Sequence, residues 1–259
     1  MPLIGTLTSG VSALRTFSKG LEVIGGNIAN VNTTAYKSAS TSFADTFSNT
    51  VGTASGSAQI GSGVQLGAIA THYSQGALTS TGKATDLGVA GKGYFVVQDG
   101  ANDFATRDGA FHFDSTGALV NAQGKSVLSA SNAPIVVPNF AAVSNISVGL
   151  DGTITATYND GTPDDTSQQV GLISVDDESR LIKQANNLFD FSSVAATLPV
   201  PAAPVAGTKI QSGALEQSNV DLTEQFADLI TTQRSFQAAS RLVTVSDSVL
   251  EDIVNLKRS

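Results

Sequence analysis

Apolar residues recur at intervals of seven along the first 32 residues of the chain. A second apolar row lies beside the first, and the two rows form one stripe on a helix of roughly 28 residues. The first row is Leu7, Leu14, Leu21 and Ile28, and the second is Leu3, Phe17, Ile24 and Val31. Because a repeat of seven is the period of a coiled coil, this segment is expected to pack against another helix.

The last forty residues show the same repeat. Asp221 and Glu224 have the spacing of a capping box, which predicts that a helix begins there. The apolar row of this helix is Leu222, Leu229, Phe236, Val243 and Leu250, with Leu242, Val249 and Leu256 alongside. We expect the two helices to pair as one discontinuous, coiled-coil-like domain of residues 1–32 and 216–259. Both stripes are wider than the seam of a two-helix pair, so apolar surface should remain for neighbouring subunits.

The middle of the chain has short β-like runs instead, at residues 93–98, 110–114 and 153–158. Asp-Gly pairs, which are typical of hairpin turns, punctuate these runs at Asp99, Asp108, Asp151 and Asp160. No long helical pattern separates the strands. The sequence therefore predicts an α+β protein whose residues 71–215 form an antiparallel, β-rich outer domain.

Residues 33–70 are expected to be an extended linker or arm between these domains. Within it, Asn49 to Gly63 is rich in small and polar residues, which is consistent with either a flexible loop or an extended arm. Val194 to Gly207 carries three prolines among small residues and is predicted to be a surface excursion.

Composition excludes several classes of site. The chain has no cysteine, and its two histidines, His72 and His112, lack metal-ligand spacing, so no metal is expected. The net charge is −8 and the basic residues are scattered, which argues against nucleic-acid binding. Charged residues make up 14% of the chain, against about 25% in ordinary soluble domains. Such a weakly charged surface suits close association of like molecules.

Motifs for catalysis or membrane insertion were also sought. Asp86 and Gly93 stand where a P-loop needs glycine and a hydroxyl residue, and no GxSxG elbow occurs. No run of 18 apolar residues predicts a membrane span, and no apolar leader with a cleavage site is present. We therefore expect neither an enzyme nor a bound cofactor nor a small-molecule substrate.

Four segments of the chain resemble the bacterial flagellar rod and hook proteins. Leu21 to Phe47 is similar to the N-terminal signature of that family, including Asn27, Asn30 and Asn32. Ser212 to Ser259 resembles its terminal helix. Thr85 to Val97 and Thr106 to Gly124 resemble its β-domain motifs, through Gly93, Phe95, Arg107, Asp108, Gly109, Phe111 and Gly117.

This resemblance implies an axial protein of the flagellum without a catalytic site. Such a protein would be exported through the flagellar type III apparatus without a cleaved signal, and would lie in the hook or basal body outside the cytoplasm. Its partners would be further copies of itself in a helical homopolymer, other axial and junction proteins, the hook cap and the export apparatus. The first apolar row of each helix, Leu7 to Ile28 and Leu222 to Leu250 at intervals of seven, would make subunit contacts, and we call these the ladder residues. Asn27, Asn30 and Asn32 would also contact a neighbouring subunit. Gly25 and Gly26 would permit close approach of a neighbouring helix.

Different features of the chain resemble different members of the family. Asp221 to Arg258 and Tyr36 to Phe47 look more like hook proteins, and Asn49 to Gly63 is shorter than the segment expected in a distal rod protein. The total length is instead similar to the distal rod protein. We favour a subunit of the hook, the tube that couples the rod to the filament for motility, with the distal rod drive shaft as the alternative.

Two other classes stay open on the residues alone. One is a secreted, β-rich adhesin-like protein, which need not pair its termini. The other is a polysaccharide-active enzyme, which needs two carboxylates converging in a cleft. The candidates by residue type are Asp151, Asp160, Asp164 and Asp165, all at turn signals.

Overall fold

A computed structural model describes residues 2–46, 48–53, 56–100, 102–162, 168–175, 177–192, 203 and 207–258. The chain forms two compact units. We call residues 1–31, 37–72 and 220–259 the helical unit, and residues 32–36 and 73–219 the β unit. Together they confirm the predicted α+β class, with one helix near each end of the chain and strands between them.

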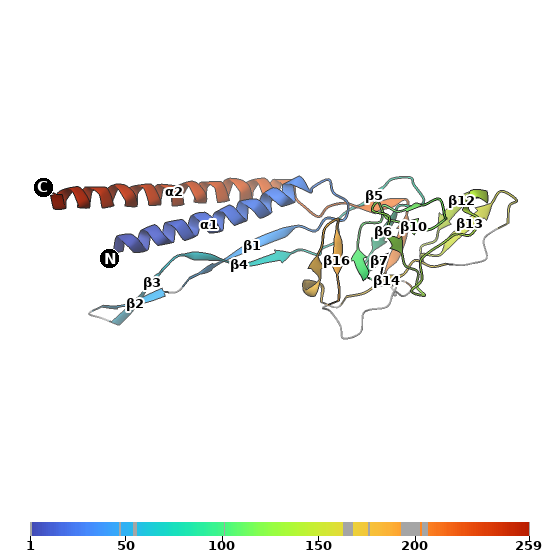
Figure 1. Cartoon of the computed structure of the whole chain (residues 1–259), viewed down its shortest axis with the longest axis horizontal. Coiled ribbons are helices and arrows are strands. Elements are labelled where there is room, and N and C mark those ends of the chain that lie inside the picture. The colour runs from blue at the N-terminus through green and yellow to red at the C-terminus, as the bar shows by residue number, and fades with distance from the viewer. Residues whose placement is uncertain are drawn as a thin grey trace. The chain divides into compact units, whose positions relative to one another are not determined.

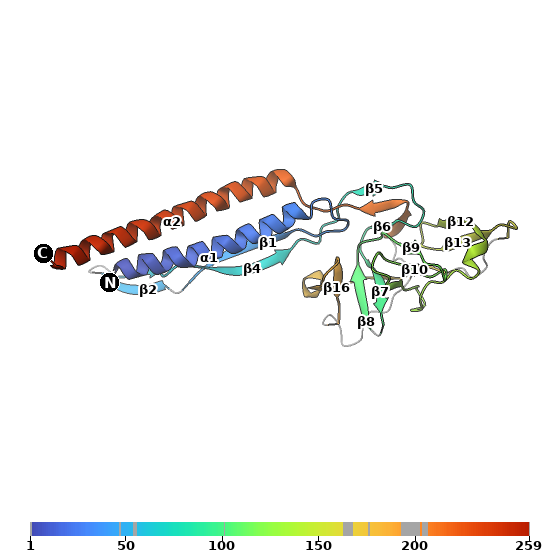
Figure 2. The same cartoon turned by 45° about the horizontal axis from the view of Figure 1, so that its top comes forward.

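Two long helices lie side by side in the helical unit (Figures 1 and 2). Helix α1 spans Pro2–Ala29 and helix α2 spans Leu222–Arg258, and α1 begins where α2 ends, so the pair is antiparallel. Close packing explains one glycine of α1, because a Cβ atom at Gly10 would lie 2.8 Å from Val243 Cγ2. The start of α2 is as predicted: Asp221 Oδ1 accepts hydrogen bonds from the backbone N–H of Thr223 at 2.7 Å and of Glu224 at 3.3 Å.

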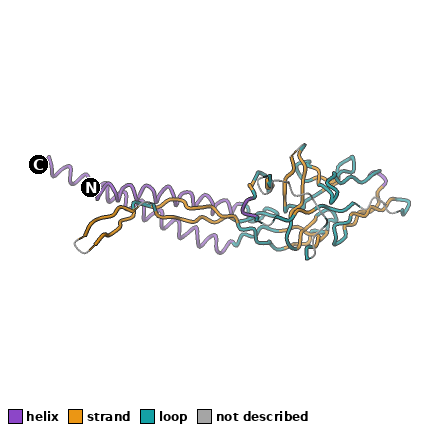
Figure 3. The backbone as a smooth tube through the Cα atoms, turned by 90° about the horizontal axis from the view of Figure 1, so that it is seen from below, coloured by secondary structure: helices purple, strands orange, loops and turns teal. Residues whose placement is uncertain are grey.

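The segment expected to be a linker or arm consists of paired strands. Strand β1 (Ala39–Asp45) pairs with β4 (Val64–Thr71), and β2 (Ser48–Thr53) pairs with β3 (Gly56–Gly61), both antiparallel. The β1–β4 ribbon runs along α1 (Figure 3). An edge-to-face contact joins the rings of Phe17 and Phe43, whose centroids are 5.7 Å apart. These side chains hold the ribbon against the helix.

Antiparallel pairing also organises the β unit, as the turn signals predicted. Its main sheet has the order β15-β16-β8-β7-β11-β10-β9, and β14 also pairs with β7. Three further pairs are β12 with β13, β17 with β6 and β18 with β5. The strands span β5 Leu78–Ser80, β6 Leu87–Ala90, β7 Tyr94–Asp99, β8 Asn102–Thr106, β9 His112–Phe113, β10 Leu119–Val120, β11 Ser126–Val127, β12 Val143–Val148, β13 Ile154–Tyr158, β14 Leu172–Ile173, β15 Ile182–Lys183, β16 Leu188–Asp190, β17 Lys209–Ser212 and β18 Ala214–Glu216. Two short 3-10 helices, η1 (Phe140–Ala142) and η2 (Glu178–Arg180), interrupt them.

Strand β7 is buried on both faces. Phe95 and Val97 enter one hydrophobic core, while Tyr94 and Val96 enter a second core. Alternate residues of a strand point to opposite faces, so an unbroken apolar run fits a central strand with a core on each side.

One predicted hairpin turn is wrong. Asp108-Gly109 does not use the left-handed backbone of a turn glycine, whereas Gly100, Gly152 and Gly161 do. Gly109 is needed for space instead, because a Cβ atom there would collide with the backbone carbonyl of Leu87.

Two parts of the sequence-based predictions fall largely on residues that the structure does not describe. Most of the predicted surface excursion at 194–207 lies outside the described residues, as do Asp164 and Asp165. Neither of the described helices is long and apolar enough to cross a membrane.

Candidate functional site

Helix α2 has two apolar faces. One faces α1 and includes Ala239, which is buried, and Phe236, Val243 and Leu250, which are half-buried. The second face is exposed, and we call it the outer stripe. Its side chains are between 38% and 76% exposed, and their spacing of three or four residues places them on one side of the helix. The outer stripe is Leu242, Val245, Val249, Ile253 and Leu256.

Further apolar side chains are exposed at the other end of α2. Leu222, Phe226 and Ile230 follow one another at intervals of four, and the last two are 50% and 55% exposed. Exposed apolar side chains that lie close together are typical of interaction surfaces. The surplus apolar surface expected from the width of the stripes is therefore present on the single chain.

The predicted ladder residues are partly covered in the single chain, and Leu7 lies beside strand β4. All but Leu222 are half-buried, which leaves each of them surface for contacts beyond the single chain. Their role in subunit contacts, and coiled-coil packing of the two helices, stay predictions. The half-buried ladder residues are Leu7, Leu14, Leu21, Ile28, Leu229, Phe236, Val243 and Leu250.

Asn27 is bonded within the molecule. Its side chain is 1% exposed, and its Nδ2 donates to the Ala39 carbonyl at 2.7 Å and to Gln225 Oε1 at 2.8 Å. Its Oδ1 accepts from the Ala39 N–H at 3.0 Å. This side chain joins α1 to β1 and α2 within one molecule, and its expected role in subunit contacts stays a prediction. The sequence signal for these internal bonds is the position of Asn27 between Ile24 and Ile28 on the apolar stripe, because a polar group buried there needs partners within the molecule.

The other asparagines and glycines of the signature lie nearer the surface. Asn30 Nδ2 donates to the Gly26 carbonyl at 2.8 Å near the end of α1, and Asn32 is exposed. Added Cβ atoms at Gly25 and Gly26 would meet nothing within 4 Å. Open space beside them leaves room for another molecule, and their role in assembly stays a prediction.

An apolar groove of about 630 Å³ lies between the first half of α1 and strand β4. Its apolar lining includes Leu7, Val11, Val64 and Leu66, and Arg15 is the charged residue of its wall. All four apolar residues are half-buried, and Arg15 is exposed. We call this feature the α1–β4 groove.

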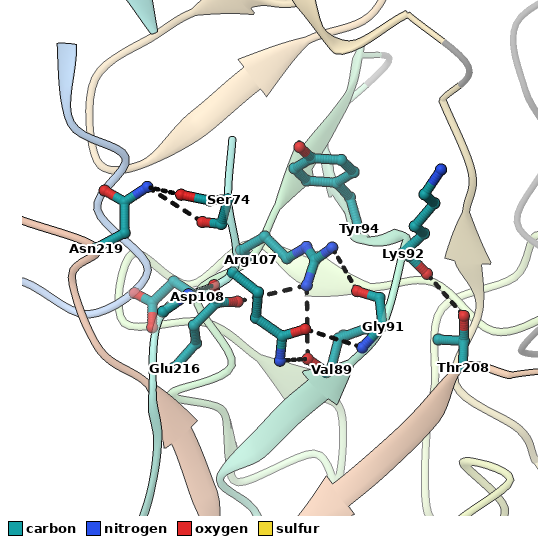
Figure 4. A network of polar contacts seen from close by, with 12 residues as sticks. Ser74, Val89, Gly91, Lys92, Tyr94, Arg107, Asp108, Thr208, Glu216 and Asn219 are labelled. Atoms are coloured by element: carbon teal, nitrogen blue, oxygen red, sulfur yellow. Dashed lines mark hydrogen bonds and ion pairs between the residues drawn. The ribbon is translucent and has the colours of Figure 1, made fainter. Parts of the chain in front are cut away.

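A buried ion pair lies within the β unit (Figure 4). Arg107 Nη1 is 3.4 Å from Glu216 Oε2, and both side chains are almost completely buried. Arg107 Nη2 donates to the Gly91 carbonyl at 2.8 Å, and the guanidinium lies 5.0 Å from the centroid of the Tyr94 ring. Glu216 Oε1 accepts from the Gly76 N–H at 2.8 Å. The pair therefore ties strands β6, β7 and β18 together.

Asp108, next to Arg107, is also bonded internally. Its Oδ1 accepts from Thr34 Oγ1 at 3.0 Å and from the Ala110 N–H at 3.2 Å. Burial raises the pKa of the Asp108 carboxyl, although the bonds from Ala110 and Thr34 lower it. Burial likewise raises the pKa of Tyr94, whose hydroxyl donates to Glu178 Oε1 at 3.0 Å. These groups hold the fold of the β unit.

The remaining motif residues of the β domain also have structural roles. The rings of Phe95 and Phe111 meet edge to face, with centroids 5.2 Å apart. Gly93 and Gly117 have positive φ angles of 128° and 81°. Sequence reasoning missed Glu216, because a single acidic residue ahead of a helix gives no sign of burial.

Asp151 and Asp160, the two carboxylates considered for catalysis that lie in the described residues, are used in turns. Asp151 Oδ1 accepts from the Thr153 N–H and Asp160 Oδ1 from the Thr162 N–H, each at 3.1 Å. The hydroxyl of the same threonine is the main cause that lowers the pKa of each carboxyl. Within the described ranges, no cluster of three or more His, Cys, Asp or Glu side chains is arranged to hold a metal.

Comparisons with known proteins extend over the whole chain. Residues 7–37 match the family described as flagella basal body rod protein, residues 88–156 the FlgE/F/G D1 domain of flagellar hook proteins, and residues 211–256 the C-terminal region of flagellar basal body rod FlgEFG proteins. The chain is similar to the flagellar basal-body rod protein FlgG of Bacillus subtilis, with 38% identity over 99% of this chain and 100% of that protein. FlgG of Agrobacterium fabrum is 31% identical over 96% of the chain and 97% of its own length.

Similarity to a hook protein is more local. The flagellar hook protein FlgE of Borreliella burgdorferi is 41% identical over 128 residues. That match covers 46% of this chain and 29% of the hook protein.

Proposed function

Since the chain belongs to the family of flagellar rod and hook proteins, we propose that it is a subunit of the distal rod, polymerised into a helical tube. The coarser role follows from the family: the protein is a structural component of the flagellum that assembles with other axial proteins. The proposal of a distal rod subunit rests on the similarity to FlgG along the full length of both chains, which leaves no large part of either chain unmatched.

A hook subunit is the second candidate. The sequence favoured the hook through the last helix and Tyr36 to Phe47. The comparisons do not specifically support this preference. Terminal helices are shared by rod and hook relatives, so they discriminate poorly, whereas length and full coverage discriminate well. The local 41% identity to a hook protein is the observation that keeps this candidate.

Assembly into a tube requires contacts between unlike surfaces of successive copies. Such head-to-tail contacts do not close, so they generate an open helical filament. The apolar residues of α2 that are 38% to 76% exposed in the single chain support this mode, because contacts between copies would bury them further. Asn30 and Asn32 are proposed to bond the next subunit; a tube of undiminished stability in Asn30→Ala would contradict that role. Export through the type III apparatus without a cleaved signal belongs to the same proposal.

Electron microscopy of the purified polymer tests rod against hook. A straight tube is expected for the distal rod, and a curved, flexible tube would favour the hook. In cells that lack the protein, we expect basal bodies whose rod ends early. Complete rods that lack only the hook would overturn the distal rod proposal.

A further inference from the structure

The α1–β4 groove is a preformed surface. The Val64 N–H donates to Ser12 Oγ at 3.3 Å, and Thr16 Oγ1 donates to the Val64 carbonyl at 3.2 Å. Ser9 Oγ donates to the Ser62 carbonyl at 3.0 Å. These side-chain bonds from α1 fix the ribbon that forms the opposite wall, so an occupant would not have to order the groove on binding.

The outer stripe of α2 has the complementary character. It is apolar along its length, and Asp252 lies at its edge, three residues after Val249 and four before Leu256. The α1–β4 groove is apolar with Arg15 in its wall. An acidic residue beside one apolar surface and a basic residue beside the other would set the register when the two surfaces meet.

We infer that the α1–β4 groove of one copy receives the outer stripe of a second copy, with Arg15 of the groove facing Asp252 of the stripe. The inference rests on the proposed function, because it names the subunit contact of the polymer. A molecule's own stripe cannot fill its own groove, since α2 is a continuous helix packed on α1, where Val243 and Leu242, at the inner edge of the stripe, lie beside Gly10. Groove and stripe are different surfaces, so each copy offers one and receives the other, and the contact propagates along a filament.

Charge reversal tests the pairing. Arg15→Glu and Asp252→Arg each place like charges together, and each is expected to raise the subunit concentration needed for polymerisation about tenfold, which corresponds to about 1.4 kcal/mol. The double variant restores the pair and should polymerise within about twofold of the wild type. Circular dichroism of the unpolymerised chains checks that each variant keeps its helices. Single variants that polymerise normally, or a double variant no better than the singles, would overturn the inference.

Disulfide trapping gives a second, independent readout, because the chain has no cysteine of its own. Subunits carrying Leu66→Cys are copolymerised with subunits carrying Ile253→Cys and then oxidised. We expect a covalent dimer of the two variants. The matched control replaces Ile253→Cys with Gln233→Cys, an exposed position of α2 away from the outer stripe, and should give little dimer. Equal or greater trapping in the control contradicts the inference.

The two proposals fail in different ways. If tubes form from the wild type but Arg15→Glu has no effect and Leu66→Cys does not link to Ile253→Cys, the groove contact is wrong and the polymeric role stands. If the wild type forms no tube and basal bodies are unchanged in cells that lack it, the proposed function fails and the groove contact fails with it.

Discussion

The two units differ in how far a single chain completes them. The β unit has two cores in which Phe95, Val97 and Phe189 are at most 1% exposed. In the described part of the helical unit, only Ile24 and Ala239 among the apolar residues are buried, and large side chains along α2 are exposed. One unit folds around its own interior, whereas the other presents a seam and leaves much of its apolar surface exposed.

This difference has a physical origin in the elements themselves. A sheet with a core on each side of its central strand buries that strand completely. Two paired helices bury one face each, and most of the stability of a helix comes from packing of its apolar face. The β unit should therefore resist unfolding as a single chain, while the helical unit should gain much of its stability on polymerisation.

Removal of a core ring from the β unit should have the largest effect. Phe95→Ala deletes a fully buried ring that packs on Phe111, and should lower the free energy of unfolding by about 3–5 kcal/mol. Chemical denaturation followed by near-UV circular dichroism of the β unit's tyrosines measures this loss. Leu150→Ala, at a side chain that is 64% exposed, is the control and should change little. Similar losses of unfolding free energy for both variants would contradict the burial of Phe95 in a packed core.

The buried ion pair should come next. Glu216→Gln leaves the Arg107 guanidinium buried without a full countercharge, and should cost about 3 kcal/mol of unfolding free energy. Replacing both partners, with Arg107→Met and Glu216→Leu, should recover part of this loss because no uncompensated charge remains. Urea denaturation of the wild type and the two variants measures the comparison. A double variant less stable than Glu216→Gln would mean that the pair's hydrogen bonds outweigh its desolvation.

Asn27→Ala should destabilise the helical unit. The change removes three hydrogen bonds and leaves the backbone N–H and carbonyl of Ala39 without this partner, which should cost about 2 kcal/mol. Asn32→Ala, at an exposed position, is the matched control and should stay within about 0.5 kcal/mol of the wild type. Thermal unfolding followed by helical circular dichroism distinguishes them. Equal stability of both variants would contradict the internal role of Asn27.

Much of this architecture was predictable because its signals are local. The repeat of seven predicted both helices, since a helical face returns every three or four residues. Asp-Gly pairs predicted the antiparallel middle, and Asp221 predicted the start of α2. Alternation was too weak in the Ser/Thr/Gly-rich segment 39–71 to predict the β1–β4 ribbon, whose strands are held to α1 by hydroxyl groups.

The features that were missed depend on residues far apart in sequence. Arg107 and Glu216 are separated by 109 positions, and neither shows locally that the other is its partner. The internal partners of Asn27, Ala39 and Gln225, likewise become apparent only once the helices and the ribbon pack. The similarity to FlgG likewise extends over the whole chain and is not confined to the terminal helices.

Acid should weaken the β unit through its turns. Hydrogen bonds from Thr162, first from its hydroxyl and then from its N–H, lower the pKa of Asp160 below its ordinary value of 3.8. A carboxyl with a lowered folded pKa adds stability above the unfolded pKa, and this stability is lost as pH falls through the folded pKa. Thr162→Val should therefore be slightly less stable than the wild type at pH 7 and equal to it near pH 2. Urea midpoints at both pH values measure this, and equal midpoints at pH 7 would contradict it.

The smallest effect on the single chain should come from the exposed end of α2. Phe226 is half-exposed, and phenylalanine and serine have similar helix propensities, so Phe226→Ser should change the free energy of unfolding by about 0.5 kcal/mol or less. Polymerisation should nevertheless fall strongly, because an aromatic side chain buried between subunits is a frequent hot spot of binding energy. Sedimentation of the polymer, compared with the control Gln233→Ser, measures this. Normal tubes from Phe226→Ser would show that this end of α2 stays exposed in the polymer. Loss of tubes without loss of fold would show that the helical unit is completed by its neighbours, as the β unit is by its own cores.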